Sequence, residues 1–433
     1  MKGFLYIKGG SKKVKVSKTY ICIDFKTFFA SVECVERGLN PFTTNLVVAD
    51  PTRGNGAICL AVSPKMKEMG VRNRCRIFEI PNNIKYITAL PRMKKYIEYA
   101  ANIYAIYLKY IAKEDIHVYS IDESFMDVTK YLKMYKLTAK QLSQKILDDI
   151  FKTTGISASV GIGTNMFLTK VALDILAKHA SNNIAYLDED LYKERLWNHK
   201  PLTDFWQIGR GISKRLEKYN IFDMEGITKI DQEVLYKEFG VNAEYLIDHA
   251  WGREPCTISQ IKAYRPVANS LSTNQILFSD YKFDQALLVL KEMVDLMCLQ
   301  LVEKNLVSDN IFLSIGYSKD IIKSTGGSVH MTVKTNSHLL ILPYFIDLFN
   351  KTTSKKYLIR RIAIGFNNVI SDEYEQFDLF TDYESVAKEK KIQKTINLIK
   401  NKYGKNSIVK AMDLEEDATT IKRNKLVGGH NAE

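Results

Sequence analysis

Two adjacent carboxylates interrupt a mostly apolar stretch in the first half of the chain. Asp122 and Glu123 stand in Ser120-Ile121-Asp122-Glu123-Ser124-Phe125, between the runs 118–121 and 125–128. Neighbouring side chains of a regular strand point to opposite faces, so both acids can serve one site only where the strand bends, as at a hairpin. Hard divalent cations prefer clustered carboxylate oxygens, and metal-dependent phosphoryl transfer uses such clusters. The pattern therefore predicts a hairpin with an acidic end.

A third acid ends a strand-like run farther upstream. Asp24 follows Tyr20-Ile21-Cys22-Ile23, and segment 27–38 after it has helical spacing. Alone, a strand-ending Asp is more typical of a turn or cap, and an adjacent Asp-Glu pair of a solvated turn. The metal-site interpretation therefore depends on both signals occurring together in these apolar flanks.

The charge balance indicates a polyanionic partner. Among 433 residues, 62 Lys and Arg against 49 Asp and Glu leave a net charge of +13, with a pI of about 9.1. This excess favours nucleic acid or an anionic membrane surface, with plain solubility charge as the alternative. The six cysteines form no CxxC pair, which is typical of a reducing compartment, and no apolar run has the length of a membrane span. These features predict a cytoplasmic protein without a membrane span; with nucleic acid as the polyanion, it would be nucleoid-associated and would have no membrane partner.

The order of predicted elements is that of an α+β domain followed by further domains. A strand, a helix, the acidic hairpin, a helix and a strand suit helices on one face of an antiparallel sheet. Gly209 and Gly211 precede a helical segment that carries Lys214, as in a helix-hairpin-helix element, although a tight turn is the alternative. Segment 267–370 alternates two helices with strand-like runs and predicts a second, smaller α/β domain.

These motifs resemble the Y-family translesion DNA polymerases. The resemblance is strongest at 21–33, 119–125 and 159–171, and Ala61-Val62-Ser63-Pro64-Lys65 is similar to the UmuC-like branch, the type of UV-damage repair proteins. It implies a DNA-directed DNA polymerase with an α+β, right-hand fold: palm, small fingers, helical helix-hairpin-helix thumb and a C-terminal α/β little finger. The implied ranges are 1–17 (basic extension), 18–27 and 88–177 (palm), 28–87 (fingers), 178–257 (thumb), 258–266 (linker), 267–370 (little finger) and 371–433 (tail).

The resemblance also implies a two-metal active site. Asp24, Asp122 and Glu123 would be the catalytic ligands, with the backbone carbonyl of Phe25, for two Mg²⁺ ions or Mn²⁺ as a substitute. Phe29 matches the steric gate that rejects ribose, although Phe28 and Phe29 could be a plain core pair. The implied nucleotide-binding residues are Thr27, Phe28, Phe29, Ser63, Lys67 and Lys170. Lys67 stands where the polymerase IV-like pattern has arginine, so it retains the charge without a bidentate fork.

The implied partners are primer–template DNA, deoxynucleoside triphosphates and a sliding clamp. Gln376, Leu379 and Phe380, in segment 376–380, resemble the Q-x-x-L-F clamp-docking peptide, with a local packing contact as the alternative. A recombinase filament is left open as a further partner. In this interpretation the chain performs low-fidelity synthesis opposite damaged bases in DNA repair and the SOS response.

Two other functions compete with this prediction. A catalytically silent DNA- and clamp-binding repair factor would need the basic patches but not Asp24, Asp122 and Glu123. A nucleotidyl cyclase would share the palm but would need neither the helix-hairpin-helix element nor a basic C-terminal domain.

Overall fold

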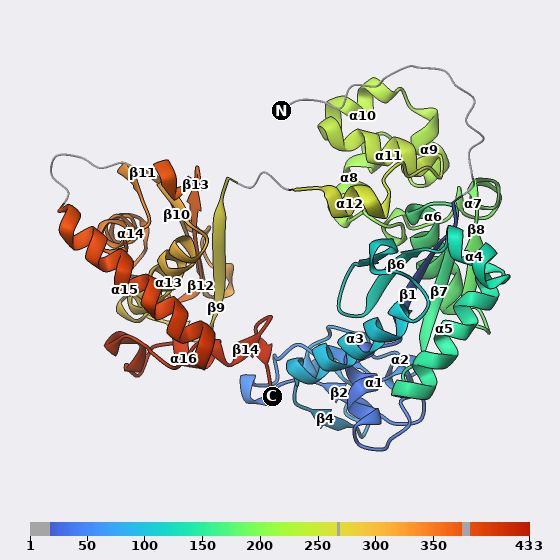
Figure 1. Ribbon diagram of the computed structural model, residues 1–433, viewed down its shortest axis with the longest axis horizontal. Helices are drawn as coiled ribbons and strands as arrows, with labels where there is room; N and C mark the ends of the chain where they lie inside the picture. Colours follow the sequence, from blue (N-terminus) through green and yellow to red (C-terminus); the bar gives the residue numbers. More distant parts are fainter. Residues whose placement is uncertain (1–17, 266–268, 375–381) are drawn as a thin grey trace. The chain divides into compact units, whose positions relative to one another are not determined.

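The computed structural model describes residues 18–265, 269–374 and 382–433 (Figure 1). The chain forms two compact units that divide between Tyr264 and Arg265. The predicted basic extension 1–17 and the predicted clamp peptide 376–380 lie outside the described residues. Within the described part, every helix is too short or too polar to cross a membrane.

The first unit is built on a five-stranded sheet with the order β5-β6-β1-β7-β8. β1 is central and antiparallel to β6 and β7, whereas β7 and β8 are parallel. The strands are β1 (Tyr20–Phe25), β5 (Ile116–Val118), β6 (Glu123–Asp127), β7 (Ala158–Gly163) and β8 (Ile184–Leu187).

Side chains of β1 alternate between two hydrophobic cores, as the pleat of a strand requires. Ile21, Ile23 and Phe25 enter the larger core beneath α1, α3 and α5. Tyr20 and Cys22 face the opposite side, where α6 packs. Asp24 belongs to this second face by alternation. The helices named are α1 (Phe28–Val35), α3 (Met93–Leu108), α5 (Ala139–Thr154) and α6 (Met166–Val171); α4 (Thr129–Tyr135) and α7 (Glu189–Leu196) complete this part.

Residues 46–89 add a small three-stranded sheet in the order β3-β2-β4, with its own apolar core. It comprises β2 (Leu46–Val48), β3 (Ala61–Val62), β4 (Ile87–Ala89) and the short helix α2 (Pro64–Glu68). Ser63 caps α2: its hydroxyl oxygen accepts from the Met66 N–H at 3.3 Å, and Pro64 occupies the first turn.

Residues 202–263 form a helical region around a third core. Its helices are α8 (Arg210–Glu217), α9 (Met224–Lys229), α10 (Gln232–Phe239), α11 (Ala243–Ala250) and α12 (Ile258–Ala263). α12 occupies most of the segment expected to be a linker. Thr257 and Gln260 form a capping box, and the buried Ile258 anchors the helix to the first unit, so the connection is shorter than expected.

The second unit contains a four-stranded sheet in the order β11-β10-β12-β9. Ile311, Leu313 and Ile315 of β10 point alternately into a core shared with α13 and α14, while the intervening Phe312 and Ser314 are more exposed. The elements are β9 (Leu271–Tyr281), α13 (Phe283–Glu303), β10 (Leu306–Tyr317), β11 (Thr325–Thr335), α14 (His338–Thr352) and β12 (Ile359–Asn367), with the short β13 (Ile370–Ser371) pairing with β10.

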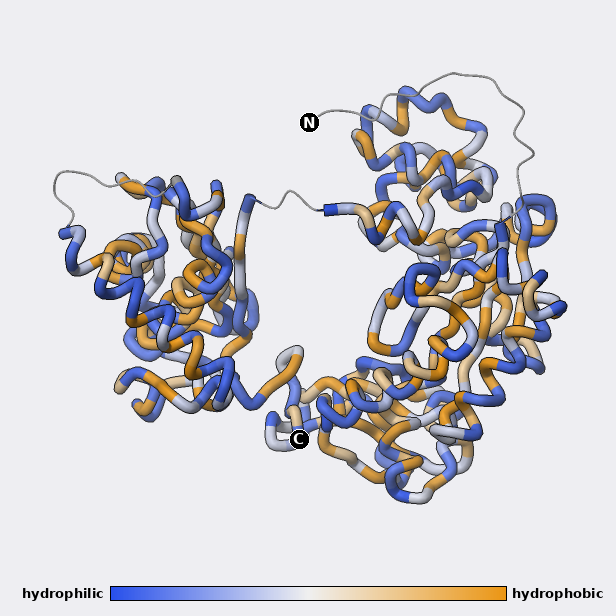
Figure 2. The backbone as a smooth tube through the Cα atoms, in the orientation of Figure 1, coloured by the Kyte–Doolittle hydropathy of each residue, from blue (hydrophilic) through white to orange (hydrophobic). Residues whose placement is uncertain are grey.

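The C-terminal segment packs against α13 of the second unit. A tail with a short helix near 392–399 was expected, but α15 spans Tyr383–Tyr403, and α16 (Thr420–Asn424) and the hairpin β14–β15 (Leu426–Val427 and His430–Asn431) follow. The fully buried Glu292 accepts the backbone N–H groups of Thr419 (2.9 Å) and Thr420 (2.9 Å). α15 is predominantly hydrophilic (Figure 2), so polar contacts anchor a segment whose composition suggests an exposed tail.

Candidate active site

The three predicted acids gather where β1 ends and β6 begins. Asp24 and Glu123 are direct partners in the antiparallel register, so their side chains share one face of the sheet. Asp122 lies in the bend just before β6, and its carbonyl oxygen accepts the Phe25 N–H at 3.1 Å. Ser120 Oγ donates to Asp122 Oδ1 at 2.6 Å. The bend required for adjacent acids to serve one site is therefore present.

Two glycines allow a lysine-bearing helix to lie against these strands. A Cβ on Gly161 would lie 2.1 Å from the Thr169 carbonyl oxygen, and one on Gly163 would lie 2.6 Å from the Thr169 nitrogen. Glycine at both positions of β7 therefore permits the close approach of α6. This packing brings the buried Lys170 Nζ to within 2.8 Å of the Glu123 carboxylate.

A second lysine, which the sequence analysis missed, pairs with the third acid. Lys178 Nζ lies 2.7 Å from Asp24 Oδ2, and Asp174 bridges Lys178 (2.8 Å) and Lys170 (2.9 Å). Lys170, Asp174 and Lys178 are spaced four residues apart, a spacing that places side chains on one face of a helix. A π-helical turn at Ala172–Leu176 continues α6 here, and such turns are frequent at functional sites.

Burial and charge act in opposite directions on these carboxylates. Burial raises the pKa of Asp24 and of Glu123, while Lys178 and Lys170 respectively oppose the rise. The charge of Asp122 also raises the pKa of Asp24, which indicates that the two acids lie close together. For Lys170, burial lowers the pKa, but Asp174 and Glu123 more than compensate and hold it above its usual value.

The donor set suits a hard cation. Asp24, Asp122 and Glu123 present only oxygen ligands, which Mg²⁺ prefers. The neighbouring Cys22 Sγ lies 3.2 Å from Glu123 Oε1, and burial followed by the Glu123 charge raises the pKa of this thiol, so it remains a protonated donor. Among the described residues, no three His, Cys, Asp or Glu side chains are arranged to hold a metal. Asp24 and Glu123 are instead each paired with a lysine ammonium group.

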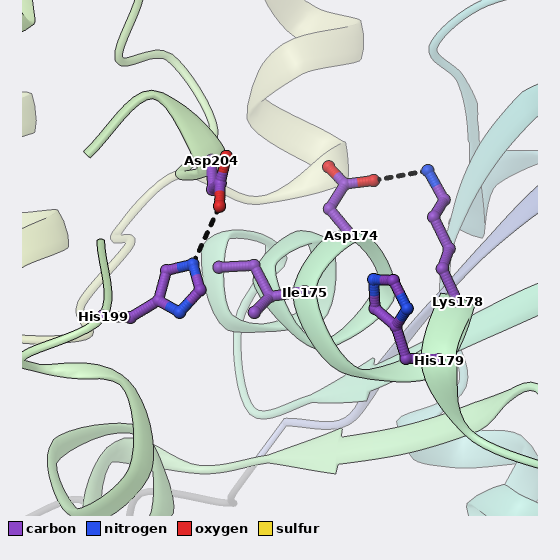
Figure 3. A pocket seen from close by; sticks show the side chains of 6 residues that line it. All are labelled: Asp174, Ile175, Lys178, His179, His199 and Asp204. Carbon is purple, nitrogen blue, oxygen red and sulfur yellow. Dashed lines mark hydrogen bonds and ion pairs between the residues drawn. The ribbon is translucent and has the colours of Figure 1, made fainter. Parts of the chain in front are cut away.

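Lys178 also lines a polar cavity of about 480 Å³. Its lining residues are Asp174, Ile175, Lys178, His179, His199 and Asp204 (Figure 3). In this lining, His199 Nε2 and Asp204 Oδ2 are 2.9 Å apart (Figure 3). Lys178 thus belongs both to the cavity wall and to the acidic cluster.

The predicted nucleotide-binding residues have different surroundings. Thr27 begins α1 in a left-handed conformation (φ 46°), a strained state common at functional sites. Phe28 is buried and Phe29 is half-buried. Ser63 is fully buried, and its hydroxyl also donates to the Thr44 carbonyl at 2.7 Å, so the structure gives it a capping role.

Lys67 belongs to the electrostatic surroundings of the acidic cluster. Its side chain is largely exposed, yet neighbouring atoms desolvate the ammonium and lower its pKa. Lys178 adds to this lowering and Asp24 opposes it, so Lys67 lies within electrostatic reach of both.

The predicted DNA-contacting residues lie on the helical region, separate from the acids. Gly209 precedes α8, Gly211 lies in its first turn, and Lys214 is exposed one turn later. A Cβ at either glycine would meet no atom within 4 Å. The backbone at the start of α8 is therefore accessible.

A buried carboxylate joins α1 to α3 beneath Phe29. Glu33 has no exposed surface and accepts from Arg92 Nε and Nη2, both at 2.9 Å, from Tyr96 Oη at 2.9 Å, and from Arg37. Burial favours a higher pKa for Glu33, but these hydrogen bonds outweigh it and lower the pKa below its usual value of 4.5. The network had no signal in the sequence beyond an acid in an apolar helix.

Glu33→Gln should destabilise the first unit in a pH-dependent way. The folded-state pKa of Glu33 is lowered, so its stabilisation is fully present above pH 4.5 and is lost as pH falls through the folded-state value. We expect the variant to lose about 2–3 kcal/mol of unfolding free energy at pH 7, and the difference from wild type to shrink in acid. All three tryptophans (Trp197, Trp206 and Trp251) lie in the first unit, so urea unfolding followed by their fluorescence measures this.

Glu36→Gln is the matched control for that measurement. Glu36 is the C-cap residue of α1; it accepts from Tyr99 Oη at 2.8 Å, pairs with Arg92 only at 3.7 Å and is partly exposed, so its loss should cost less than about 1 kcal/mol. Equal losses for the two variants would contradict the assignment of the buried network to Glu33.

The comparisons agree with this architecture. Residues 23–174 match the impB/mucB/samB family, and residues 268–379 match the impB/mucB/samB family C-terminal domain. UvrX of Bacillus subtilis (strain 168), provisionally named for UV-damage repair, is 32% identical over 96% of this chain and 98% of UvrX. DNA polymerase IV 2 of the same organism is 28% identical over 95% of this chain and 98% of that protein. The solved structure of a Y-family DNA polymerase chimera, Dbh-Dpo4(243-245)-Dbh, covers 82% of this chain and 99% of its own at a TM-score of 0.62 and 20% identity.

The fold is that of a Y-family polymerase, with a catalytic core and a C-terminal little-finger domain. The chain belongs to the impB/mucB/samB family of Y-family DNA polymerases and DNA-repair proteins. The resemblance seen in the acidic motifs and the predicted α+β fold are thus confirmed. Members of this family generally use Mg²⁺, DNA and deoxynucleoside triphosphates.

Proposed function

We propose that this chain is a template-directed, low-fidelity DNA polymerase that extends a primer 3′ end opposite damaged bases. The observation that carries the proposal is the pairing of Asp24 with Glu123 at the ends of two antiparallel strands, with Asp122 in the adjoining bend. A protein that only bound DNA would not need three acids at one point of an otherwise basic chain. Family membership and similarity to DNA polymerase IV 2 support the same activity.

In this proposal, Asp24, Asp122, Glu123 and the Phe25 carbonyl would hold two Mg²⁺ ions, which supply activation of the primer hydroxyl and neutralise phosphate charge. The residues of the chain have roles of their own. Lys170, Lys178 and Lys67 concentrate positive charge beside the acids, where a triphosphate would lie. An anion bound there would release the lysines from the carboxylates. Phe29, at the start of α1, would exclude a ribose hydroxyl by steric overlap.

Contacts with DNA and protein partners complete the proposal. The accessible backbone at Gly209 and Gly211, with Lys214, would bind phosphates without reading sequence. In the second unit, the partly exposed Lys334 and the exposed Arg361 would serve the same role. Gln376, Leu379 and Phe380 remain the proposed clamp-docking peptide, and a recombinase filament remains a candidate partner. Such an enzyme would act on cytoplasmic, nucleoid DNA during repair.

Primer extension by the full chain tests the function. With single deoxynucleotides, on undamaged and abasic templates, we expect extension that requires Mg²⁺, stops with a chelator and resumes on adding Mg²⁺ or Mn²⁺. Primer–template binding is measured in parallel by fluorescence anisotropy. Binding without extension, even after clamp and recombinase filament are added, would instead favour the catalytically silent repair factor.

A further inference from the structure

The proposed gate residue is backed by a second aromatic ring. Phe29 and Tyr96 stack with ring centroids 4.5 Å apart and planes 18° apart. Phe28 contacts the Phe29 ring at a wider tilt of 49° and a centroid distance of 5.9 Å. Phe29 is half-buried, whereas Tyr96 has no exposed surface. Tyr96 therefore covers one face of Phe29 from inside the protein.

Tyr96 is itself held in place by the buried carboxylate. Its Oη donates to Glu33 Oε1 at 2.9 Å, and the same carboxylate accepts two hydrogen bonds from Arg92. Glu33 lies one turn after Phe29 on α1, while Arg92 immediately precedes α3 and Tyr96 lies in its first turn. The helix that carries Phe29 and the helix that carries its backing ring are thus cross-linked through charged hydrogen bonds, which are stronger than neutral ones.

A steric gate works only if its side chain cannot yield. Phenylalanine has alternative staggered positions about χ1, and a half-buried ring can reach them when space is available. Tyr96 fills the space behind Phe29, so a sugar hydroxyl that pressed on the ring would meet two rings and the Glu33 network. An ordinary core pair would stabilise the fold equally well but would have no effect on which sugar is accepted.

We propose that Tyr96, fixed by Glu33, is a positioning residue for sugar selection, and that rejection of ribonucleotides depends on it as well as on Phe29. The inference rests on the proposed polymerase function. It adds a specificity determinant on α3, at a side chain with no exposed surface.

The test compares full-length Tyr96→Leu, Tyr96→Phe and Tyr99→Leu by kcat/KM for one ribonucleotide and its deoxynucleotide. Tyr96→Leu should shift the ratio toward the ribonucleotide by about three- to tenfold. This fold-change corresponds to the interaction free energy of one aromatic pair. Tyr96→Phe keeps the ring but removes the hydroxyl bond to Glu33, so its ratio should lie between those of wild type and Tyr96→Leu. Tyr99→Leu is the matched control, since Tyr99 lies on the same helix but donates to the partly exposed Glu36 at 2.8 Å.

The outcomes separate this inference from the function on which it rests. If Tyr96→Leu does not fold, as judged by tryptophan fluorescence, Tyr96→Met fills the space without a ring and takes its place. An unchanged sugar ratio in the ring-less variant, in a chain that extends primers and responds to Phe29→Ala, overturns the inference alone. A wild-type chain that extends no primer overturns the proposed function and this inference with it.

Discussion

Replacing Asp122 with alanine is expected to reduce primer extension by about 10³-fold or more, since loss of a metal-binding carboxylate removes several kcal/mol of transition-state stabilisation. Asp122 is partly exposed and its side chain contacts Ser120, so the fold should persist. Glu123→Ala should have a similar catalytic effect. Steady-state extension with Mg²⁺ measures the loss of catalysis. Primer–template binding is measured in parallel and should stay near the wild-type value.

Asp127→Asn provides the control for this loss. Asp127 lies on the same strand and the same face as Glu123, but it pairs with Tyr20 in the register and with Lys18 by charge, at the far end of β6. Extension by this variant should match wild type. Normal turnover by Asp122→Ala would remove that residue from the proposed metal site, while loss of turnover in all three variants would indicate a general effect of charge.

Phe29→Ala is expected to admit ribonucleotides, with an increase of about 10–200-fold in their kcat/KM relative to deoxynucleotides, the range for one small group against a pocket wall. Removing the ring takes away the atoms that would overlap a ribose hydroxyl. It also exposes the face of Tyr96 that Phe29 covers. Competition between a ribonucleotide and its deoxynucleotide on one template measures the ratio directly.

Phe29→Tyr is the conservative variant for the same experiment. It keeps the ring and adds only a hydroxyl, so sugar selection should be retained. Deoxynucleotide incorporation is the internal reference for active enzyme. If Phe29→Ala discriminates between the sugars as wild type does, the gate lies elsewhere and Phe29 belongs with Phe28 in the core.

The palm strands and the acidic hairpin could be predicted because their signals are local. Ile21, Ile23 and Phe25 alternate with Tyr20, Cys22 and Asp24, and a period of two places each set on one face of a strand. Two adjacent acids between apolar runs demand a bend for the same reason. The α+β class and the C-terminal domain followed from this order of elements and are confirmed.

Other parts of the fold depend on contacts between distant segments. The C-terminal segment was expected to be a tail because it is charged and poor in aromatic residues, yet Glu292 binds its backbone N–H groups in a buried site. No periodicity marks a lone glutamate in α13 as an acceptor for residues near position 420. The linker was likewise shorter than expected, since Ile258 packs on the first unit.

For the candidate site, residue type and chain order pointed to Asp24, Asp122 and Glu123, because a hard cation restricts which side chains can serve it, while the family resemblance implied Lys170. The partners of these groups follow from packing. Lys178 reaches Asp24, and Tyr96 reaches Phe29, only because α6 and α3 lie against the strands and helix that carry the predicted residues. Those approaches depend on missing side chains, such as those of Gly161 and Gly163, and on buried charge pairs that form across the fold. The sequence contains these glycines and charged residues, but it does not record the distances between the segments that carry them.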